Sequence, residues 1–239
     1  MDGFSYHDIF QTKGIEYIII IAFLLLLIPF WAIINKRAVI ARNIRKAIGI
    51  LTLDKLNIPR GIFFSNNHMW THLEKSGAAK VGMDDLLLHI TGEVNLNFRK
   101  EPEDKIRKGD LLAEIDQDGK QLKVFAPISG KILDMNPLVH ETPGILNEDP
   151  YGDGWICKIQ PDNWVEETGS YYLADEAVRW SKAEIERFKD FIAVSMGKYS
   201  PEPGVIILQE GGEIADKTLS RLPAEIWLDF QKEFLDRPV

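Results

Sequence analysis

Cysteine is almost absent from this chain of 239 residues, in which Cys157 is the only one. A single cysteine excludes an internal disulfide bond and any metal site that is built from cysteines alone. Basic residues are a minority too, since the formal net charge is -8, and the sequence has no basic stripe with interleaved aromatic residues. The composition therefore argues against a nucleic-acid partner.

Sequence motifs of the common catalytic sites are also missing. The chain has no P-loop, no glycine signature of a dinucleotide-binding fold and no zinc-ligand motif. His68 and His72 stand four residues apart, but no third ligand is evident near them, whereas zinc sites use three or four protein ligands. The sequence therefore predicts no catalytic residue and no metal site, and argues against an enzyme.

Charged residues are absent from Tyr17 to Ile34, within the apolar segment 14–35. About 20 helical residues span the hydrocarbon core of a bilayer. A signal peptide would carry a basic N-terminal region and a small-residue cleavage site, and a buried helix of this length is rarely apolar on every face. Tyr17 and Trp31 lie near the ends, where interfacial aromatic residues occur. The segment therefore predicts one transmembrane helix over 14–35.

The charges on either side of this segment predict its orientation. Lys13 precedes it, whereas Lys36, Arg37, Arg42, Arg45 and Lys46 follow it. By the positive-inside rule, the C-terminal side is cytoplasmic. We therefore expect a single-pass protein of the inner or cell membrane, with a short non-cytoplasmic N-terminus over 1–13 and a cytoplasmic soluble part. Residues 36–60 are predicted to form a basic juxtamembrane helix or linker, which either continues the membrane helix or lies on anionic lipid.

Short strands separated by turn residues are predicted from 61 to 165. The candidate strands are Ile62–Phe64, Met69–Leu73, Ala78–Gly82, Leu87–Ile90, Gly92–Leu96, Leu111–Asp116, Leu122–Ala126, Gly130–Met135 and Trp155–Ile159. One short helix is expected around Met83–Leu88. Many short strands at close spacing are typical of a small β-sandwich or flattened barrel.

Several motifs follow one another through this region. They are His68-Met69-Trp70, Val81-Gly82-Met83-Asp84, Ile106-Arg107-Lys108-Gly109-Asp110, Ala126-Pro127-Ile128-Ser129-Gly130 and Asn147-Glu148-Asp149-Pro150-Tyr151-Gly152-Asp153-Gly154-Trp155. In this order and spacing they resemble the motifs of the glycine cleavage system H-protein, a relative of the lipoyl domain. The resemblance implies that 61–165 is a mainly β, lipoyl-like domain, a barrel-sandwich hybrid.

One hairpin in this domain holds the candidate cofactor site. The stretch 111–130 is predicted to form two strands joined at Asp118-Gly119, a dipeptide that favours a type I′ turn. Lys120 follows the turn, and the resemblance implies that a lysine at such a tip carries lipoate. In the family this lysine lies eight residues before the proline of the Pro-Ile-Ser-Gly turn, and counting back from Pro127 gives Gly119. Lys120 is therefore one residue out of register, and a shift by one residue turns a strand side chain to the other face.

Two functional hypotheses follow from this register. The sequence favours a membrane-anchored, non-catalytic binding or assembly subunit of a redox complex, in which the hairpin carries no lipoate and the protein has no cofactor. The alternative is a lipoyl carrier of the glycine cleavage system or a related complex, in which lipoyl-Lys120 shuttles an aminomethyl group or electrons between protein partners. A third hypothesis, a periplasmic adaptor of the efflux type, needs the opposite orientation and a long helical insertion, and the sequence has neither.

Residues 166–239 are predicted to form an α-rich C-terminal extension. Ala174–Ser195 is expected to form one or two helices, with a capping box from Ser181 to Glu184. Pro223–Leu235 is expected to form a final amphipathic helix. Aromatic residues at helical spacing are more often core, so we expect these helices to cover the β-domain; the alternative is a docking surface for a partner.

Overall fold

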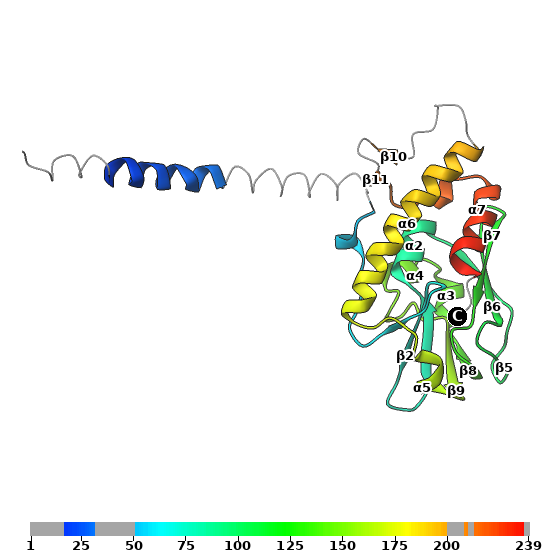
Figure 1. Cartoon of the computed structure of the whole chain (residues 1–239). Helices are drawn as coiled ribbons and strands as arrows, with labels where there is room; N and C mark the ends of the chain where they lie inside the picture. Colours follow the sequence, from blue (N-terminus) through cyan, green and yellow to red (C-terminus); the bar gives the residue numbers. More distant parts are fainter. Residues whose placement is uncertain (1–16, 32–50, 200–207, 210–212, 237–239) are drawn as a thin grey trace, which may run out of the picture. The chain divides into compact units, whose positions relative to one another are not determined.

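The computed structural model describes residues 17–31, 51–199, 208–209 and 213–236 (Figure 1). The chain divides into two units, Met1–Gly49 and Ile50–Val239, and each is described by itself. The described residues of the first unit form one helix over 17–31, in which the large apolar side chains are exposed.

The expected transmembrane helix over 14–35 is wrong for the residues that the structure describes. Within the described ranges, no helix is both long and apolar enough to span a membrane. The remaining parts of the expected segment, 14–16 and 32–35, lie outside the described residues, as do the expected N-terminus over 1–13 and most of the expected linker.

Two antiparallel β-sheets form the centre of the second unit. The larger sheet has the order β1 (Phe63–Phe64), β2 (Met69–Leu73), β3 (Ala79–Met83), β9 (Cys157–Pro161), β8 (Gly130–Met135) and β5 (Lys105–Ile106). The smaller sheet has the order β4 (Asn95–Phe98), β6 (Leu111–Gln117) and β7 (Lys120–Phe125). Buried side chains from both sheets, such as Val81 and Ile132 from the larger and Ile115 and Val124 from the smaller, belong to one hydrophobic core.

Short helices connect the strands and close the ends of this core. They are η1 (Leu53–Lys55), α2 (Asp85–Thr91), α3 (Leu138–Glu141), α4 (Ile145–Glu148) and α5 (Trp164–Thr168). The expected strand Leu87–Ile90 is wrong, because these residues lie in α2, which Asp84 caps by accepting the N–H of Leu87 at 2.7 Å. Before η1, Leu51 is buried and donates its N–H to the carbonyl of Ile214 at 2.8 Å, so residues from 51 onward belong to the second unit.

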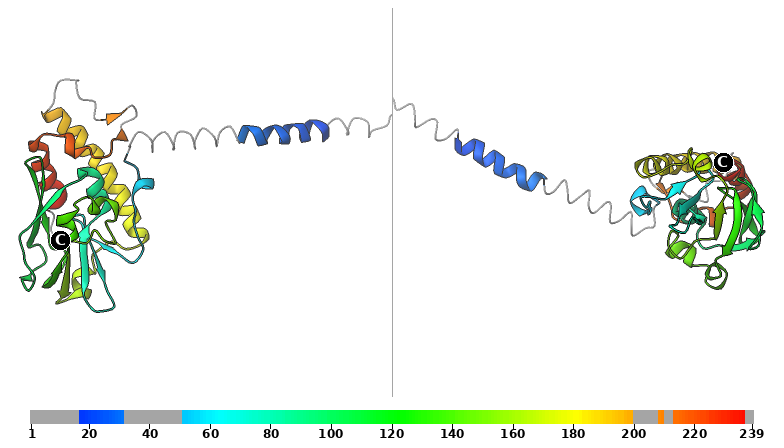
Figure 2. Two further views of the ribbon diagram at one scale, coloured as in Figure 1. Left: turned by 180° about the vertical axis from the view of Figure 1, so that it is seen from behind. Right: turned by 90° about the horizontal axis from the view of Figure 1, so that it is seen from below.

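One long helix, α6 (Asp175–Tyr199), crosses one side of the β-domain (Figure 2). Ala177, Trp180, Ser181, Glu184, Ile185, Phe188, Phe191, Ile192 and Ser195 form its buried stripe at helical spacing. The expected capping box from Ser181 to Glu184 is wrong, since both residues are buried inside the helix rather than at its start. After α6 the chain contains the two-stranded pair β10 (Leu208–Gln209) and β11 (Glu213–Ile214).

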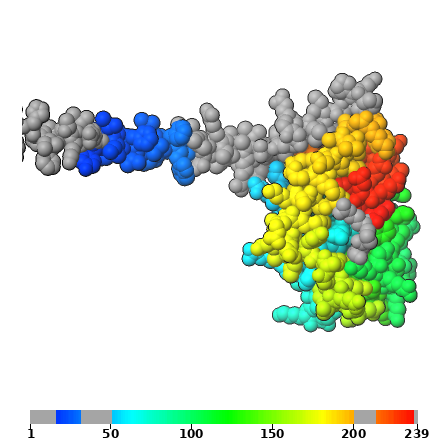
Figure 3. Space-filling model, viewed as in Figure 1, coloured from blue at the N-terminus to red at the C-terminus, as the bar shows by residue number. Residues whose placement is uncertain are grey.

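The last described elements are η2 (Leu219–Arg221), α7 (Ala224–Phe230) and the π-helical turn η3 (Gln231–Leu235). Pro223 stands just before the first residue of α7, as expected for a helix start. Trp227, Phe230 and Phe234 are buried, and α7 and η3 both contact β7. Figure 3 shows the C-terminal helices α7 and η3, in red, beside the green surface to which the smaller sheet belongs. The C-terminal helices therefore cover the β-domain.

Candidate functional site

The β6–β7 hairpin has the turn that its sequence predicts. Asp118 and Gly119 both have positive φ, 53° and 79°, as a type I′ turn requires, and Gln117 pairs with Lys120 across it. Both turn residues are exposed. A Cβ built on Gly119 would meet no heavy atom within 4 Å, so the tip of the hairpin projects into open space.

Lys120 is the first residue of β7, and its side chain is on the covered face of the strand. Burial alternates along β7: Leu122 and Val124 are buried, whereas Gln121 and Lys123 are exposed. Because side chains two apart share a face, Lys120 is on the same side as Leu122 and Val124. Lys120 itself is half-buried, and Lys123, on the other face, is exposed.

The ammonium group of Lys120 is bound by the C-terminal part of the chain. Its Nζ donates to the carbonyl oxygens of Ser220 at 2.5 Å and Leu222 at 3.4 Å. It also lies 5.1 Å from the centroid of the Trp227 ring, within the range of a cation–π interaction. The lysine that the sequence singles out therefore has partners on three sides, all about a hundred residues away along the chain.

The same C-terminal part protects the edge of the smaller sheet. β7 is an edge strand, and an open edge exposes unpaired N–H and C=O groups. The side-chain amide of Gln231 accepts the N–H of Lys123 at 2.6 Å and donates to its carbonyl at 3.4 Å. Trp227 donates its indole N–H to the carbonyl of Leu219 at 2.8 Å, which holds η2 over the hairpin.

A second polar cluster lies in the core and joins the first two motifs to α6. His68 is fully buried; its Nδ1 lies 2.8 Å from Asp84 Oδ2 and its Nε2 lies 3.7 Å from Glu184 Oε2. Burial alone would lower the pKa of His68, but the two carboxylates outweigh it and raise the pKa to about 9. The imidazole is therefore protonated at neutral pH, and the cluster is a buried ion network with no open face.

Other motif residues also have structural partners. Trp70 covers Gly82 on the neighbouring strand so closely that a Cβ there would lie 2.6 Å from the indole. Tyr151 accepts the backbone N–H of Asp85 at 3.0 Å, which ties the Asn147–Trp155 motif to the start of α2. These contacts give the two motifs a structural role, since they fix the packing of β2 on β3 and of the 147–155 segment on the start of α2.

The residues that the structure describes contain neither a metal site nor a reactive thiol. No group of three or more His, Cys, Asp or Glu side chains in those ranges could hold a metal ion. His68 has a positive φ of 61° and is buried just before β2, whereas His72 is exposed on the strand, so the two do not form a pair. Burial raises the pKa of the Cys157 thiol, so this side chain stays protonated at neutral pH.

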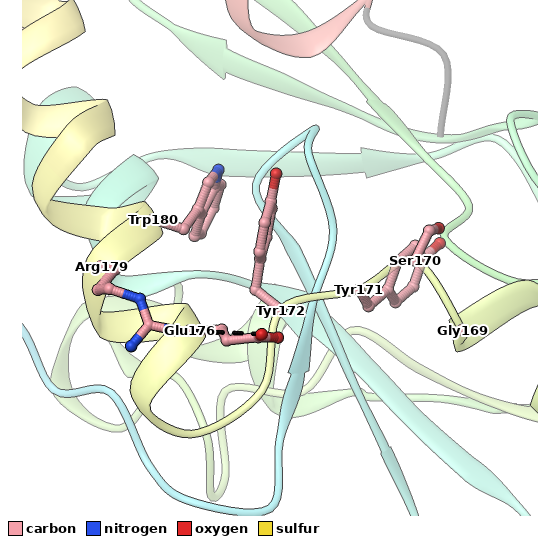
Figure 4. Close-up of a pocket in the computed structure, with 7 residues that line it drawn as sticks. All are labelled: Gly169, Ser170, Tyr171, Tyr172, Glu176, Arg179 and Trp180. Carbon is pink, nitrogen blue, oxygen red and sulfur yellow. Dashed lines mark ion pairs between the residues drawn. The ribbon is translucent and has the colours of Figure 1, made fainter.

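A shallow pocket of about 480 Å³ lies where the loop 169–172 meets α6 (Figure 4). Its walls include Trp180, which stacks on Tyr172 with ring centroids 5.1 Å apart, and the exposed residues Glu176 and Arg179. None of the residues that contact Lys120 lines this pocket. It is therefore separate from the candidate site on the hairpin.

A two-sheet β-domain that places a lysine beside the exposed turn of a hairpin defines a lipoyl-type module. Comparison with family models matches residues 62–184 to the family described as glycine cleavage H-protein. The chain belongs to the glycine cleavage H-protein family. It is therefore a carrier or scaffold subunit rather than a catalyst, as the sequence predicts.

Individual relatives give the same family. A "Probable glycine cleavage system H protein" of Thermococcus kodakarensis is 30% identical over 118 residues, which cover 49% of this chain and 87% of the relative. "Glycine cleavage system H protein 2" of Aquifex aeolicus is 31% identical over 132 residues, covering 54% and 81%. A crystal structure of the H protein from Mycobacterium marinum matches with 23% identity and a TM-score of 0.44, covering 50% of this chain and 94% of that one.

The family match ends inside α6, at residue 184, so η2, α7 and η3 lie beyond it. Sequence reasoning singled out Lys120 but missed all three of its partners. Two of them are backbone carbonyls, which leave no mark in a sequence, and the third, Trp227, was expected only as part of an apolar helix face. The candidate site thus combines a hairpin that lies within the family match and C-terminal residues that lie beyond it.

Proposed function

We propose that this chain is a carrier of the H-protein type, with lipoate attached to Lys120. The observation that carries the proposal is the place of Lys120, directly after the exposed turn of the hairpin in a domain that belongs to the H-protein family. This was the alternative hypothesis from the sequence. The first hypothesis, a hairpin without a cofactor in an assembly subunit, has less support, because the relatives that match this region are described as glycine cleavage H proteins.

The residues around Lys120 fit an amide-linked group. The open tip at Gly119 leaves room for a chain that extends away from the hairpin. An amide at Nζ keeps one N–H, which either the Ser220 or the Leu222 carbonyl can accept. When bound, lipoate supplies a dithiolane ring that accepts electrons or an aminomethyl group.

Attachment is an acyl transfer from an activated lipoyl donor, an acyl adenylate or acyl thioester. Lys120 Nζ first loses a proton and then attacks the acyl carbon, so that the C–N bond forms and the bond to the adenylate or thiolate breaks. A second proton leaves the nitrogen, and the cation becomes a neutral amide. The expected partners are the proteins that load and unload such an arm, in a glycine cleavage system or a related complex.

Mass spectrometry of the full chain purified from its source tests this function. We expect an added mass of about 188 Da on the peptide that contains Lys120, because an amide-linked lipoyl group replaces one hydrogen. Lys120→Arg should lose the addition completely, whereas Lys123→Arg, which changes the exposed lysine on the same strand, should keep it. An unmodified Lys120, in cells whose other lipoyl proteins are fully modified, would contradict the proposal.

A further inference from the structure

Lys120 is held by a part of the chain that the family model does not cover. The holding residues lie in 219–227, here named the cover segment, which runs from η2 into α7. Ser220 and Leu222 supply carbonyl acceptors and Trp227 supplies a ring face. We propose that the cover segment withholds the Lys120 amine from acyl transfer and must be displaced before lipoate can be attached. The proposal rests on Lys120 being the attachment site.

The contacts hold the Lys120 nitrogen against the cover segment. Acyl transfer needs a neutral amine with its lone pair directed at the acyl carbon. Hydrogen bonds from an ammonium to carbonyl oxygens are charge-assisted, and a ring face also favours the cation. These contacts must be broken before the nitrogen can direct its lone pair at an acyl carbon, and the cover segment also blocks approach from the covered face.

The cover segment is held firmly at two ends but touches the lysine through little of its surface. Leu219 and Trp227 are buried, and the indole N–H of Trp227 holds the Leu219 carbonyl at 2.8 Å. Between them, Arg221 is exposed and Ser220 is half-buried. Lys120 meets this middle part only through two carbonyl oxygens. Turning the carbonyls of Ser220 and Leu222 away from the hairpin would therefore free the amine while Leu219 and Trp227 stay buried.

Modification changes what the cover segment can bind. An amide nitrogen has one N–H and no charge, so it can donate to one of the two carbonyls, and the cation–π contact is lost. The segment therefore holds an unmodified lysine more strongly than a modified one. The cover segment should consequently be held less tightly against a modified hairpin, which exposes the lipoyl group to its protein partners.

The acetylation rate of Lys120 reports directly on how well the cover segment shields its amine, and this measurement does not depend on any lipoyl enzyme. The folded full chain is treated with a trace of acetic anhydride, and the acetylation rates of Lys120 and Lys123 are compared by peptide mass spectrometry. We expect Lys120 to react at least about tenfold more slowly than Lys123, since its ammonium is bound and half-buried. In Trp227→Phe, which removes the N–H that holds Leu219, the difference should shrink severalfold. Equal rates for the two lysines in the unaltered chain would overturn the proposal.

Hydrogen exchange provides a second measurement that does not disturb the core. Lys120→Gln removes the ammonium, and we expect amide exchange in 219–227 to become several times faster, whereas Lys123→Gln should leave it unchanged. Unchanged exchange in Lys120→Gln would also overturn the proposal. A different result would contradict the carrier function alone. In Trp227→Phe, Lys120 would react quickly with the anhydride but would gain no lipoyl group in a cell that modifies its own lipoyl proteins. That result would leave the cover supported.

Discussion

Replacing Phe230 with alanine is expected to lower the free energy of unfolding by about 3–5 kcal/mol. Phe230 is fully buried and stacks on Phe234 with ring centroids 4.6 Å apart. It also meets the edges of Phe188 and Phe191 of α6, at 5.8 and 6.0 Å. Removal of one ring therefore leaves a cavity where α6, α7 and the β-domain meet. A single domain is stable by only about 5–15 kcal/mol, so this loss is a large share of the total.

The matched control lies two positions away on the same helix. Leu228 is 59% exposed, so Leu228→Ala removes apolar atoms from the surface rather than from the core and should change the free energy of unfolding by no more than about 0.5 kcal/mol. Urea unfolding of the full chain, followed by tryptophan fluorescence, gives both values. If Phe230→Ala matched Leu228→Ala, the C-terminal helices would not be part of the folded core, and the cover over Lys120 would lose its support.

Local chemistry was sufficient to predict some elements from the sequence. The hairpin turn is one, because Asp118 and Gly119 tolerate positive φ and few other pairs do. The final helix is another, since Pro223 stands just before its first turn and its apolar residues repeat at helical spacing. Both signals lie within a few residues of the structure that they specify.

Elements that depend on distant packing were predicted poorly. In the run Leu86–Ile90 every residue except His89 is buried, so a helical period is weak; a helix was expected around Met83–Leu88 and a strand over Leu87–Ile90, and the structure has α2 through both, capped by Asp84. Glu184 resembled a capping residue because its sequence spacing from Ser181 is right, yet it is buried in the middle of α6 beside His68.

The candidate site, too, was predicted from the sequence only where local chemistry determines it. Lys120 could be named from its place beside a turn, and the family motifs identify the hairpin. The hydrogen bonds of its side chain depend on Ser220 and Leu222, which lie about 100 residues further along and contribute only backbone carbonyls. A count from Pro127 indicated that Lys120 is out of register, and the structure gives this a physical meaning: the side chain is on the face that the C-terminal helices cover.

The buried ion network predicts a marked pH dependence of stability. In the folded chain the pKa of His68 is raised from 6.5 to about 9. Burial alone would lower this pKa, but Asp84 and Glu184 raise it by more. Below pH 6.5 the imidazole is protonated in both the folded and the unfolded chain, and the full contribution of His68 to the free energy of unfolding is present. Between 6.5 and 9 only the folded chain keeps the proton, so stability falls by about 1.4 kcal/mol per pH unit, about 3 kcal/mol in all.

His68→Gln tests this contribution, because titrating groups that do not contact His68 are common to both chains and cancel in the difference, so what remains comes from His68 with Asp84 and Glu184. The variant should be less stable by about 3–5 kcal/mol near pH 6.5, since Asp84 and Glu184 lose the cation between them. The difference from the unaltered chain should then shrink as pH rises through about 9. His140→Gln, at an exposed position, serves as the control and should follow the unaltered chain throughout. Urea unfolding at half-unit pH steps measures all three chains. Parallel profiles for His68→Gln and the unaltered chain would show that His68 carries no extra proton in the fold. A converging pair would show that the first two motifs and α6 are held together by a protonated histidine.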